Sequence, residues 1–240
     1  MKERAVVVLS GGQDSTTCLF WALDQGYQVT TLTFDYQQRH AIEILSAQKI
    51  ARMAGVSNVV MDVPKLFGAS PLISDNTLEQ YDDYGSLPKG LENTFVPMRN
   101  QLFITLAANF AYAAGISNVV YGNCMDDQEG YPDCRPAFIE LIEAASNAGT
   151  FTNKSLKIIT PLMHMSKKDT ILLAKRLPGC MEALAFSHTA YDGKYPPVCK
   201  DHASILRARG FEEAGIPDPL VMRAVDEGLM LMPDTINYKG

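Results

Sequence analysis

The sequence predicts an α/β fold in which a parallel sheet of five strands carries helices on both faces. Short apolar or β-branched runs alternate along the chain with longer segments whose apolar residues recur at helical spacing. Several helical segments stop just before a glycine, as at Gly26, Gly55 and Gly115, where helices commonly end. Helices that alternate with strands connect parallel neighbours, so the pattern favours a sheet covered on both faces.

The expected strands are the short runs between these helical segments. Residues 5–9 form a continuous apolar run, which is typical of a strand buried on both faces, and residues 28–34 are rich in β-branched side chains. Three further strands are expected at residues 58–63, 119–122 and 158–160. Helices are expected between and after them, at residues 15–24, 40–53, 99–114, 135–148 and 166–176.

Two regions depart from the alternation. We expect residues 1–177 to form the α/β domain and residues 178–240 to form a small C-terminal extension, because the chain becomes rich in Pro, Gly, His and Cys after Leu177. Residues 67–93 are polar, contain Pro and Gly, and show no period. A connection of that length is a functional lid or a disordered segment, and we expect a lid-like insertion.

Charge and composition exclude several classes of protein. The formal net charge of −6 disfavours a non-specific nucleic-acid coat, because such surfaces carry excess Lys and Arg. No apolar run reaches the length of a membrane span. Five cysteines at irregular spacing do not resemble a secreted disulfide framework. We therefore expect a cytoplasmic protein with reduced thiols.

The segment SGGQDS, Ser10 to Ser15, lies between the first strand and the first helix. Its glycines allow successive backbone N–H groups to point at one spot, and the helix start adds a partial positive charge, so the expected ligand is phosphate. No lysine follows the glycines, which separates the segment from the GxxxxGK[ST] loop. Asp14 would repel a phosphate unless Mg²⁺ lies between them, so we assign Asp14 to the metal.

SGGQDS closely resembles the loop of the ATP pyrophosphatase family, whose members cleave ATP between the α and β phosphates. Four further segments follow in order: FDYQQRH at 34–40, ENTFVPMRN at 92–100, YGNCMDDQEGYPDCR at 121–135, and TPL at 160–162 with Lys167 beyond it. Together they resemble the 7-cyano-7-deazaguanine synthases over about residues 5–210.

The resemblance implies a Rossmann-like fold of the adenine nucleotide alpha hydrolase type and a defined reaction. Such enzymes use ATP and Mg²⁺ to convert 7-carboxy-7-deazaguanine and ammonia to 7-cyano-7-deazaguanine (preQ0), a step of queuosine biosynthesis. An adenylated carboxylate and an amide are intermediates, and AMP and pyrophosphate are released. The resemblance also implies a homodimer, and the expected partners include no nucleic acid and no membrane.

The same resemblance distributes roles over the site. ATP would be held by Leu9, Ser10, Gly11, Gly12, Gln13, Asp14 and Ser15. Catalysis would rest on Asp14, Ser15, Arg99 and Lys167, the last two offsetting phosphate or substrate carboxylate charge, with Lys168 a weaker choice than Lys167. The base would be bound by Phe95, Arg99, Asp127, Tyr131 and Asp133, since a carboxylate accepts two parallel hydrogen bonds. Alternatively, Asp126, Asp127 and Asp133 are loop acids and helix caps, and we expect at least one to be so.

A zinc motif of these enzymes, C-x8-C-x2-C-x2-C, is altered here. Its first position falls on Ala190, its second on Cys199 and its third on His202, and the fourth is lost near Ser204. Structural zinc requires four N or S ligands, and His188 is the nearest further donor. Either zinc is retained by Cys199, His202 and His188 with another ligand, or packing replaces the metal.

The altered motif leaves two other functions open. A change beside the substrate could leave amide formation intact and impair the second step, so that the product is 7-amido-7-deazaguanine. A chain that binds ATP without catalysis is the other alternative, although an intact SGGQDS loop speaks against it.

Overall fold

The computed structural model describes residues 2–38, 42–64, 68, 70–74, 76–150, 155–198 and 200–239. A single sheet of five strands lies at its centre in the order β3-β2-β1-β4-β5. Every neighbouring pair is parallel, as the sequence predicts. The strands are β1 (Arg4–Val8), β2 (Gln28–Asp35), β3 (Ser57–Asp62), β4 (Asn118–Val120) and β5 (Lys157–Ile159).

All five expected helices of the α/β domain are present, and three more follow. The helices are α1 (Gln13–Asp24), α2 (Ile42–Met53), α3 (Arg99–Ala113), α4 (Pro136–Ala148), α5 (Lys167–Arg176), α6 (Cys180–Leu184), α7 (His202–Ala214) and α8 (Pro219–Asp226). Short 3₁₀ helices are η1 (Tyr84–Ser86), η2 (Met125–Asp127), η3 (Pro132–Cys134) and η4 (Ile236–Tyr238). None of the helices in the described ranges is long and apolar enough to cross a bilayer.

The start of α1 differs from the expectation by two residues. The helix begins at Gln13, because Gly12 adopts the extended conformation of an N-cap and the chain turns helical directly after it. Asp14 and Ser15 consequently lie in the first helical turn and not before it. Their side chains are therefore positioned by the helix itself.

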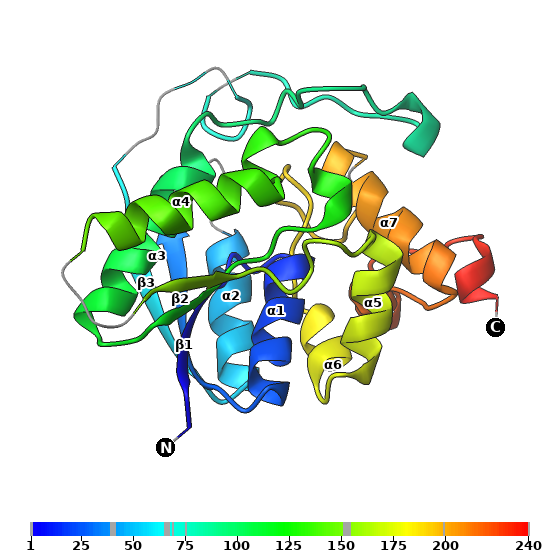
Figure 1. Cartoon of the computed structure of the whole chain (residues 1–240). Coiled ribbons are helices and arrows are strands. Elements are labelled where there is room, and N and C mark those ends of the chain that lie inside the picture. The colour runs from blue at the N-terminus through cyan, green and yellow to red at the C-terminus, as the bar shows by residue number, and fades with distance from the viewer. Residues whose placement is uncertain are drawn as a thin grey trace.

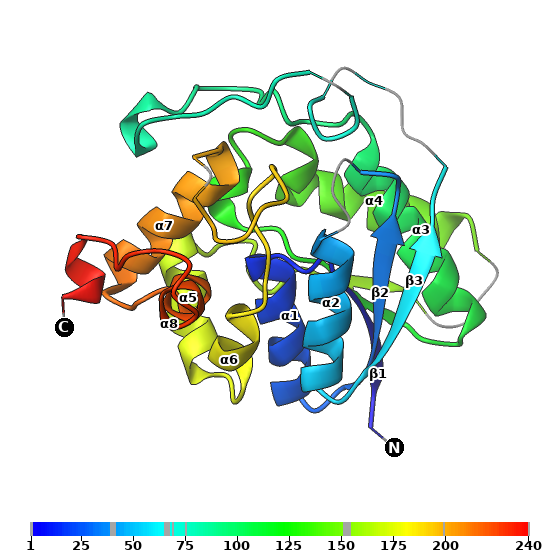
Figure 2. The same ribbon diagram turned by 180° about the vertical axis from the view of Figure 1, so that it is seen from behind.

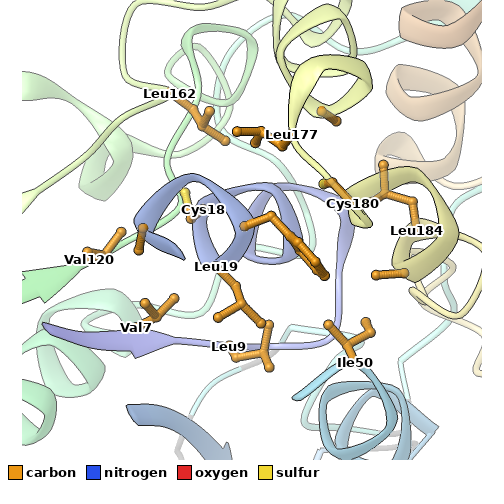
Figure 3. Close-up of a cluster of buried hydrophobic side chains, with 14 of the residues drawn as sticks. Val7, Leu9, Cys18, Leu19, Ile50, Val120, Leu162, Leu177, Cys180 and Leu184 are labelled. Carbon is orange, nitrogen blue, oxygen red and sulfur yellow. The ribbon is translucent and has the colours of Figure 1, made fainter. Parts of the chain in front are cut away.

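Helices cover both faces of the sheet (Figures 1 and 2). Successive residues of β1 point to opposite faces, so Val7 belongs to the hydrophobic cluster beneath α1, α2 and α5, and Val6 to the cluster beneath α3 and α4. Figure 3 shows the first cluster, where Leu19 of α1 lies between the sheet and the neighbouring helices. Both faces of β1 are fully buried, which explains its uninterrupted apolar sequence.

The C-terminal residues share this core. Cys180 and Leu184 of α6 are fully buried in the same cluster as α1 (Figure 3). Phe211 of α7 belongs to this cluster too and is also fully buried. α7 runs beside α5 on the side of the molecule away from α3 (Figure 1). The segment that follows α6 is thereby returned to the carboxyl edge of the sheet.

The described part of the 67–93 insertion extends over the molecule and reaches α7 (Figures 1 and 2). The backbone N–H of Tyr81 donates to the carbonyl of Lys200 over 2.9 Å, and the N–H of Lys200 donates to Oε1 of Gln80 over 2.9 Å. The guanidinium of Arg209 lies 3.5 Å from the centre of the Tyr84 ring. The insertion thus contacts the C-terminal extension.

Candidate active site

A cavity of about 260 Å³ opens at the carboxyl ends of β1, β2 and β4. From β1 the chain adds β2 and then β3 on one side of the sheet, and then adds β4 and β5 on the other side of β1. The direction in which strands are added therefore reverses between β1 and β4. Ligands of parallel α/β sheets bind at such a reversal. The cavity walls combine residues that follow three strands with residues of α5, α7 and the segment between α6 and α7.

The loop between β1 and α1 presents an uncapped helix start to this cavity. Gly12, the N-cap residue of α1, has no side chain to accept from the N–H groups of the first turn, and its own N–H donates to Oγ of Ser10 over 3.3 Å. The Ser10 and Ser15 hydroxyls lie 3.0 Å apart and shape the turn. Gly11 has φ of 90°, and a Cβ there would lie 2.3 Å from the Glu43 carbonyl oxygen, so only glycine fits. Free N–H groups at a helix start form an anion site.

Six of the seven residues expected to hold ATP line the cavity, namely Leu9, Ser10, Gly12, Gln13, Asp14 and Ser15. Gly11 does not, because it is pressed against the first turn of α2. Its carbonyl instead accepts a hydrogen bond of 2.8 Å from the backbone N–H of His188. This contact brings the C-terminal segment to the loop.

Lys167 joins two carboxylates inside the cavity. Its Nζ lies 2.6 Å from Oδ2 of Asp14 and 3.1 Å from Oδ1 of Asp127, with all three side chains less than one-fifth exposed. Burial alone would lower the pKa of Lys167, but the carboxylates of Asp127 and Asp14 outweigh it and raise that pKa well above its ordinary value. Lys167 therefore stays protonated and positively charged. Lys168, the weaker choice, is exposed and lies outside the cavity lining.

The donors around Lys167 fit Mg²⁺. Ligand atoms of Asp14, Cys124 and Asp127 lie within 4.8 Å of one another, and Oδ1 of Asp14 is buried without a hydrogen-bond partner. Mg²⁺ prefers carboxylate oxygens. Burial raises the pKa of the Cys124 thiol, which stays protonated and donates to Asp127 over 3.3 Å. The two carboxylates, and not the thiol, are the ligands that suit this ion.

Arg99 begins α3 directly after Met98, which has φ of 63°. Its guanidinium lies among phenols that line the same cavity, those of Tyr36, Tyr121, Tyr131 and Tyr191. Burial raises the pKa of Tyr36 and of Tyr131 to about 12, so both remain neutral at pH 7. Among the residues that the structure describes, no carboxylate lies within ion-pairing distance of Arg99. Its charge is available for an anionic ligand.

The expected base-binding residues divide into two groups. Asp127 and Tyr131 line the cavity, whereas Phe95 and Asp133 do not. Phe95 lies in a turn in which its backbone N–H donates a hydrogen bond to the Glu92 carbonyl. The Asp133 carboxylate accepts a hydrogen bond from the backbone N–H of Asn100 at the start of α3. Asp133 thus contacts the start of α3, while its Oδ1 is buried without a hydrogen-bond partner among the described residues.

Comparison with known proteins adds independent evidence. A family model described as queuosine biosynthesis protein QueC matches residues 4–215. The chain belongs to the QueC family. The 7-cyano-7-deazaguanine synthase of Laribacter hongkongensis is 46% identical over 92% of this chain and 95% of its own length. Those of Chromobacterium violaceum and Gloeobacter violaceus are each 45% identical, over 94% and 91% of this chain and 96% and 95% of their own.

This family membership confirms the expectation of an ATP-dependent ligase of the 7-cyano-7-deazaguanine synthase type. The solved structures are more distant. A 4-thiouridine synthetase in complex with RNA and ATP covers 95% of this chain and 53% of its own length at 16% identity, with a TM-score of 0.46. That likeness is too low to bear on the function of a QueC-family chain.

The zinc ligands expected from the QueC resemblance are not assembled among the described residues. Nε2 of His188 lies 2.7 Å from the carbonyl oxygen of Ala190, and Nε2 of His202 lies 3.3 Å from Oε1 of Glu92. Cys199 lies outside the described residues. In the described part of the chain, the one metal-binding group found is that of Asp14, Cys124 and Asp127. The described donors do not fit a tetrahedral zinc site.

Several cavity residues of this QueC-family chain were given no individual role from the sequence. Gln38, Asn100 and Asn123 lie in motif segments that the sequence indicates, whereas Glu43 and Arg207 do not. Asn123 carries a usable signal, since it lies in the loop that leaves β4, where polar side chains meet the ligand. Arg207 carries none. It lies on α7, buried, with its Nε 2.6 Å from Oδ2 of Asp218, and only the return of α7 to the sheet brings it here.

Proposed function

We propose that this cavity converts 7-carboxy-7-deazaguanine to its nitrile through two successive activations by ATP. The observation that carries the proposal is the meeting of an uncapped helix start, the Lys167–Asp14–Asp127 cluster and the unpaired Arg99 in one cavity. The helix start suits a triphosphate, and the cluster of Lys167 with its two carboxylates suits the metal and the charge of that triphosphate. Arg99 suits a carboxylate.

ATP would lie with its phosphates on the N–H groups at the start of α1. Asp14 and Asp127 would hold Mg²⁺, which supplies neutralisation of phosphate charge when bound. Lys167 would donate from Nζ to the phosphate oxygens as negative charge develops on them. Preorganised cations in a buried site stabilise such charge without reorganisation of solvent.

Arg99 would bind the carboxylate of the substrate and orient it for the first step. A carboxylate oxygen attacks the α phosphorus, the bond to the bridging oxygen of the β phosphate breaks, and pyrophosphate leaves. Neutral ammonia then attacks the acyl carbon, AMP departs and the nitrogen loses one proton, which leaves the amide. In the second round the amide oxygen attacks the α phosphorus of another ATP. Loss of the two N–H protons and of AMP then gives the nitrile.

Product analysis tests this proposal. The protein is incubated with ATP, Mg²⁺, ammonia and 7-carboxy-7-deazaguanine, and the base is followed by mass spectrometry. We expect the nitrile mass with two pyrophosphates released per base. Persistence of the amide in excess ATP would establish the amide-forming alternative. Nucleotide binding without pyrophosphate release would support the alternative that the chain binds ATP without catalysis. The family suggests a homodimer, which light scattering checks independently.

A further inference from the structure

The side chain of Asn123 is a buried amide that the described fold leaves without hydrogen-bond partners. Its residue is 1% exposed, and neither Nδ2 nor Oδ1 has a partner among the described residues. It lines the cavity three residues after the end of β4. A buried amide without partners is costly, and native proteins rarely keep one unless something else satisfies it.

Two other polar side chains of the cavity, Asn100 and Cys134, have little capacity left for Asn123. The Nδ2 of Asn100 donates to Sγ of Cys134 over 3.6 Å, and its Oδ1 accepts from the Tyr121 hydroxyl over 3.0 Å. The Cys134 thiol interacts with the Asn123 amide, but a thiol is a weak donor and a weak acceptor, and no hydrogen bond of ordinary geometry joins the two. The amide thus keeps both a donor and an acceptor for a ligand.

The position of Asn123 in the cavity indicates which part of the bound ligand lies next to its amide. Gly122 lies against the first turn of α1, since a Cβ there would be 3.1 Å from the backbone nitrogen of Ser15. Asn123 therefore lies beside the phosphate loop, on the side of β4 and Asp127. The residues that follow β2 lie on the opposite side of β1 from Asn123. We assign that opposite side of the cavity to the adenosine of ATP.

We propose that Asn123 recognises the ring lactam of the deazaguanine substrate, its amide accepting from the ring N–H and donating to the ring carbonyl. This inference rests on the function proposed above. A primary amide and a lactam are complementary, because each places one donor beside one acceptor in a plane. A phosphate or carboxylate has no donor and would leave Oδ1 of Asn123 facing a negative charge.

Because the lactam is present in substrate, amide and nitrile alike, its recognition affects binding more than chemistry. Removing the amide should therefore raise KM for the base and leave kcat largely unchanged. A bidentate contact of this kind corresponds to a factor of about ten to a hundred in discrimination.

The test compares wild type with Asn123→Leu, which has similar size without polar atoms, and with Asn123→Ser, should the leucine variant fail to fold. Asn109→Leu, at an exposed position of α3, is the control. The substrates are 7-carboxy-7-deazaguanine and its analogue with hydrogen in place of the ring carbonyl oxygen. Binding is also measured by calorimetry, without turnover.

We expect wild type to bind the analogue about tenfold or more weakly than the substrate, and the Asn123 variant to bind both equally. Undiminished discrimination by the variant would overturn the inference. So would a rise in KM for ATP alone, which would place adenine against Asn123. If wild type binds the substrate but forms no amide or nitrile, the proposed function fails while the binding comparison still decides the role of Asn123.

Discussion

The ammonium nitrogen of Lys167 lies 2.6 Å from Oδ2 of Asp14, although 153 positions separate the two residues in the chain. The contact joins the first turn of α5 to the first turn of α1. It exists because β1 and β4 are neighbours in the sheet and the chain after β5 returns across them. One ion pair therefore ties the phosphate loop to the opposite wall of the cavity.

Replacement of Lys167 by Met should abolish adenylation and weaken the fold. The change leaves Asp14 and Asp127 as neighbouring buried carboxylates without their cation, a loss typically worth about 3 kcal/mol. Pyrophosphate release should fall by about 100-fold or more. Lys168→Met, one residue further along on the exposed side of α5, should leave both activity and melting temperature unchanged. Equal loss in the two variants would contradict the role of Lys167.

Replacement of Asp14 by Ala should remove pyrophosphate release, again by about 100-fold or more, while the protein stays folded. The reason is that the side chain is the metal-facing acid of the loop, while Lys167 keeps its ion pair with Asp127 when the Asp14 carboxylate is removed. Asp24→Ala, at the exposed far end of the same helix, serves as the control. Pyrophosphate release is measured with a coupled assay, and folding is checked by circular dichroism. Retained turnover in Asp14→Ala would remove this residue from the mechanism.

Replacement of Arg99 by Met should raise KM for 7-carboxy-7-deazaguanine more than KM for ATP, because its guanidinium forms no ion pair among the described residues. We expect a change of about tenfold or more. Arg99→Lys should recover only part of the loss, since an ammonium cannot pair with a carboxylate through two parallel bonds. Arg52→Met, at an exposed position of α2, should have no effect. A larger change in KM for ATP would reassign Arg99 to the phosphates.

Glu43 makes stability depend on pH. Burial raises the pKa of Glu43 to about 7 from 4.5, although Arg99 opposes the shift. The folded state thus binds this proton more tightly than the unfolded chain does. The resulting stabilisation is fully present below pH 4.5 and is lost as the pH rises through 7. In the ligand-free protein, Glu43→Gln should match wild type in melting temperature at acidic pH and exceed it by a few degrees at pH 8. Glu140→Gln, at an exposed site of α4, should follow wild type at both values.

The purified protein should contain much less than one zinc per chain. Nε2 of His188 faces a backbone carbonyl and Nε2 of His202 faces Glu92, so neither imidazole belongs to a metal-binding group in the described part of the chain. Metal analysis by mass spectrometry checks this directly. A chelator should leave the melting temperature unaltered, and so should Cys199→Ser. One zinc per chain would show that the altered motif still binds metal.

Much of this site follows from one rule applied to the sequence, that ligands meet the carboxyl ends of parallel strands. The rule places Asp14 after β1 and Asp127 after β4, and the capping residue Ser166 places Lys167 in the first turn of α5. It does not separate Asp127 from Asp126. Only the path of the η2 turn decides that Asp126 accepts from the backbone N–H of Lys167 while Asp127 faces its ammonium.

Other residues depend on contacts that no local pattern records. Arg207 reaches the cavity because α7 runs beside α5, and this packing is set by apolar contacts such as those of Phe211 in the core. Phe95 belongs to a segment that matches the family closely, yet a turn of the backbone keeps its ring out of the cavity lining. Sequence similarity identifies such a segment, whereas the direction of each side chain depends on the folded backbone.

The cavity takes its walls from both ends of the chain, from Leu9 near the start to Arg207 near the end. During synthesis the phosphate loop leaves the ribosome long before the segment from His188 to Arg207 exists. A nascent chain that has not reached this segment lacks the part of the cavity lining that the segment supplies. Its capacity to consume ATP should therefore arise only after the segment has been made and His188 has bonded to Gly11 of the loop.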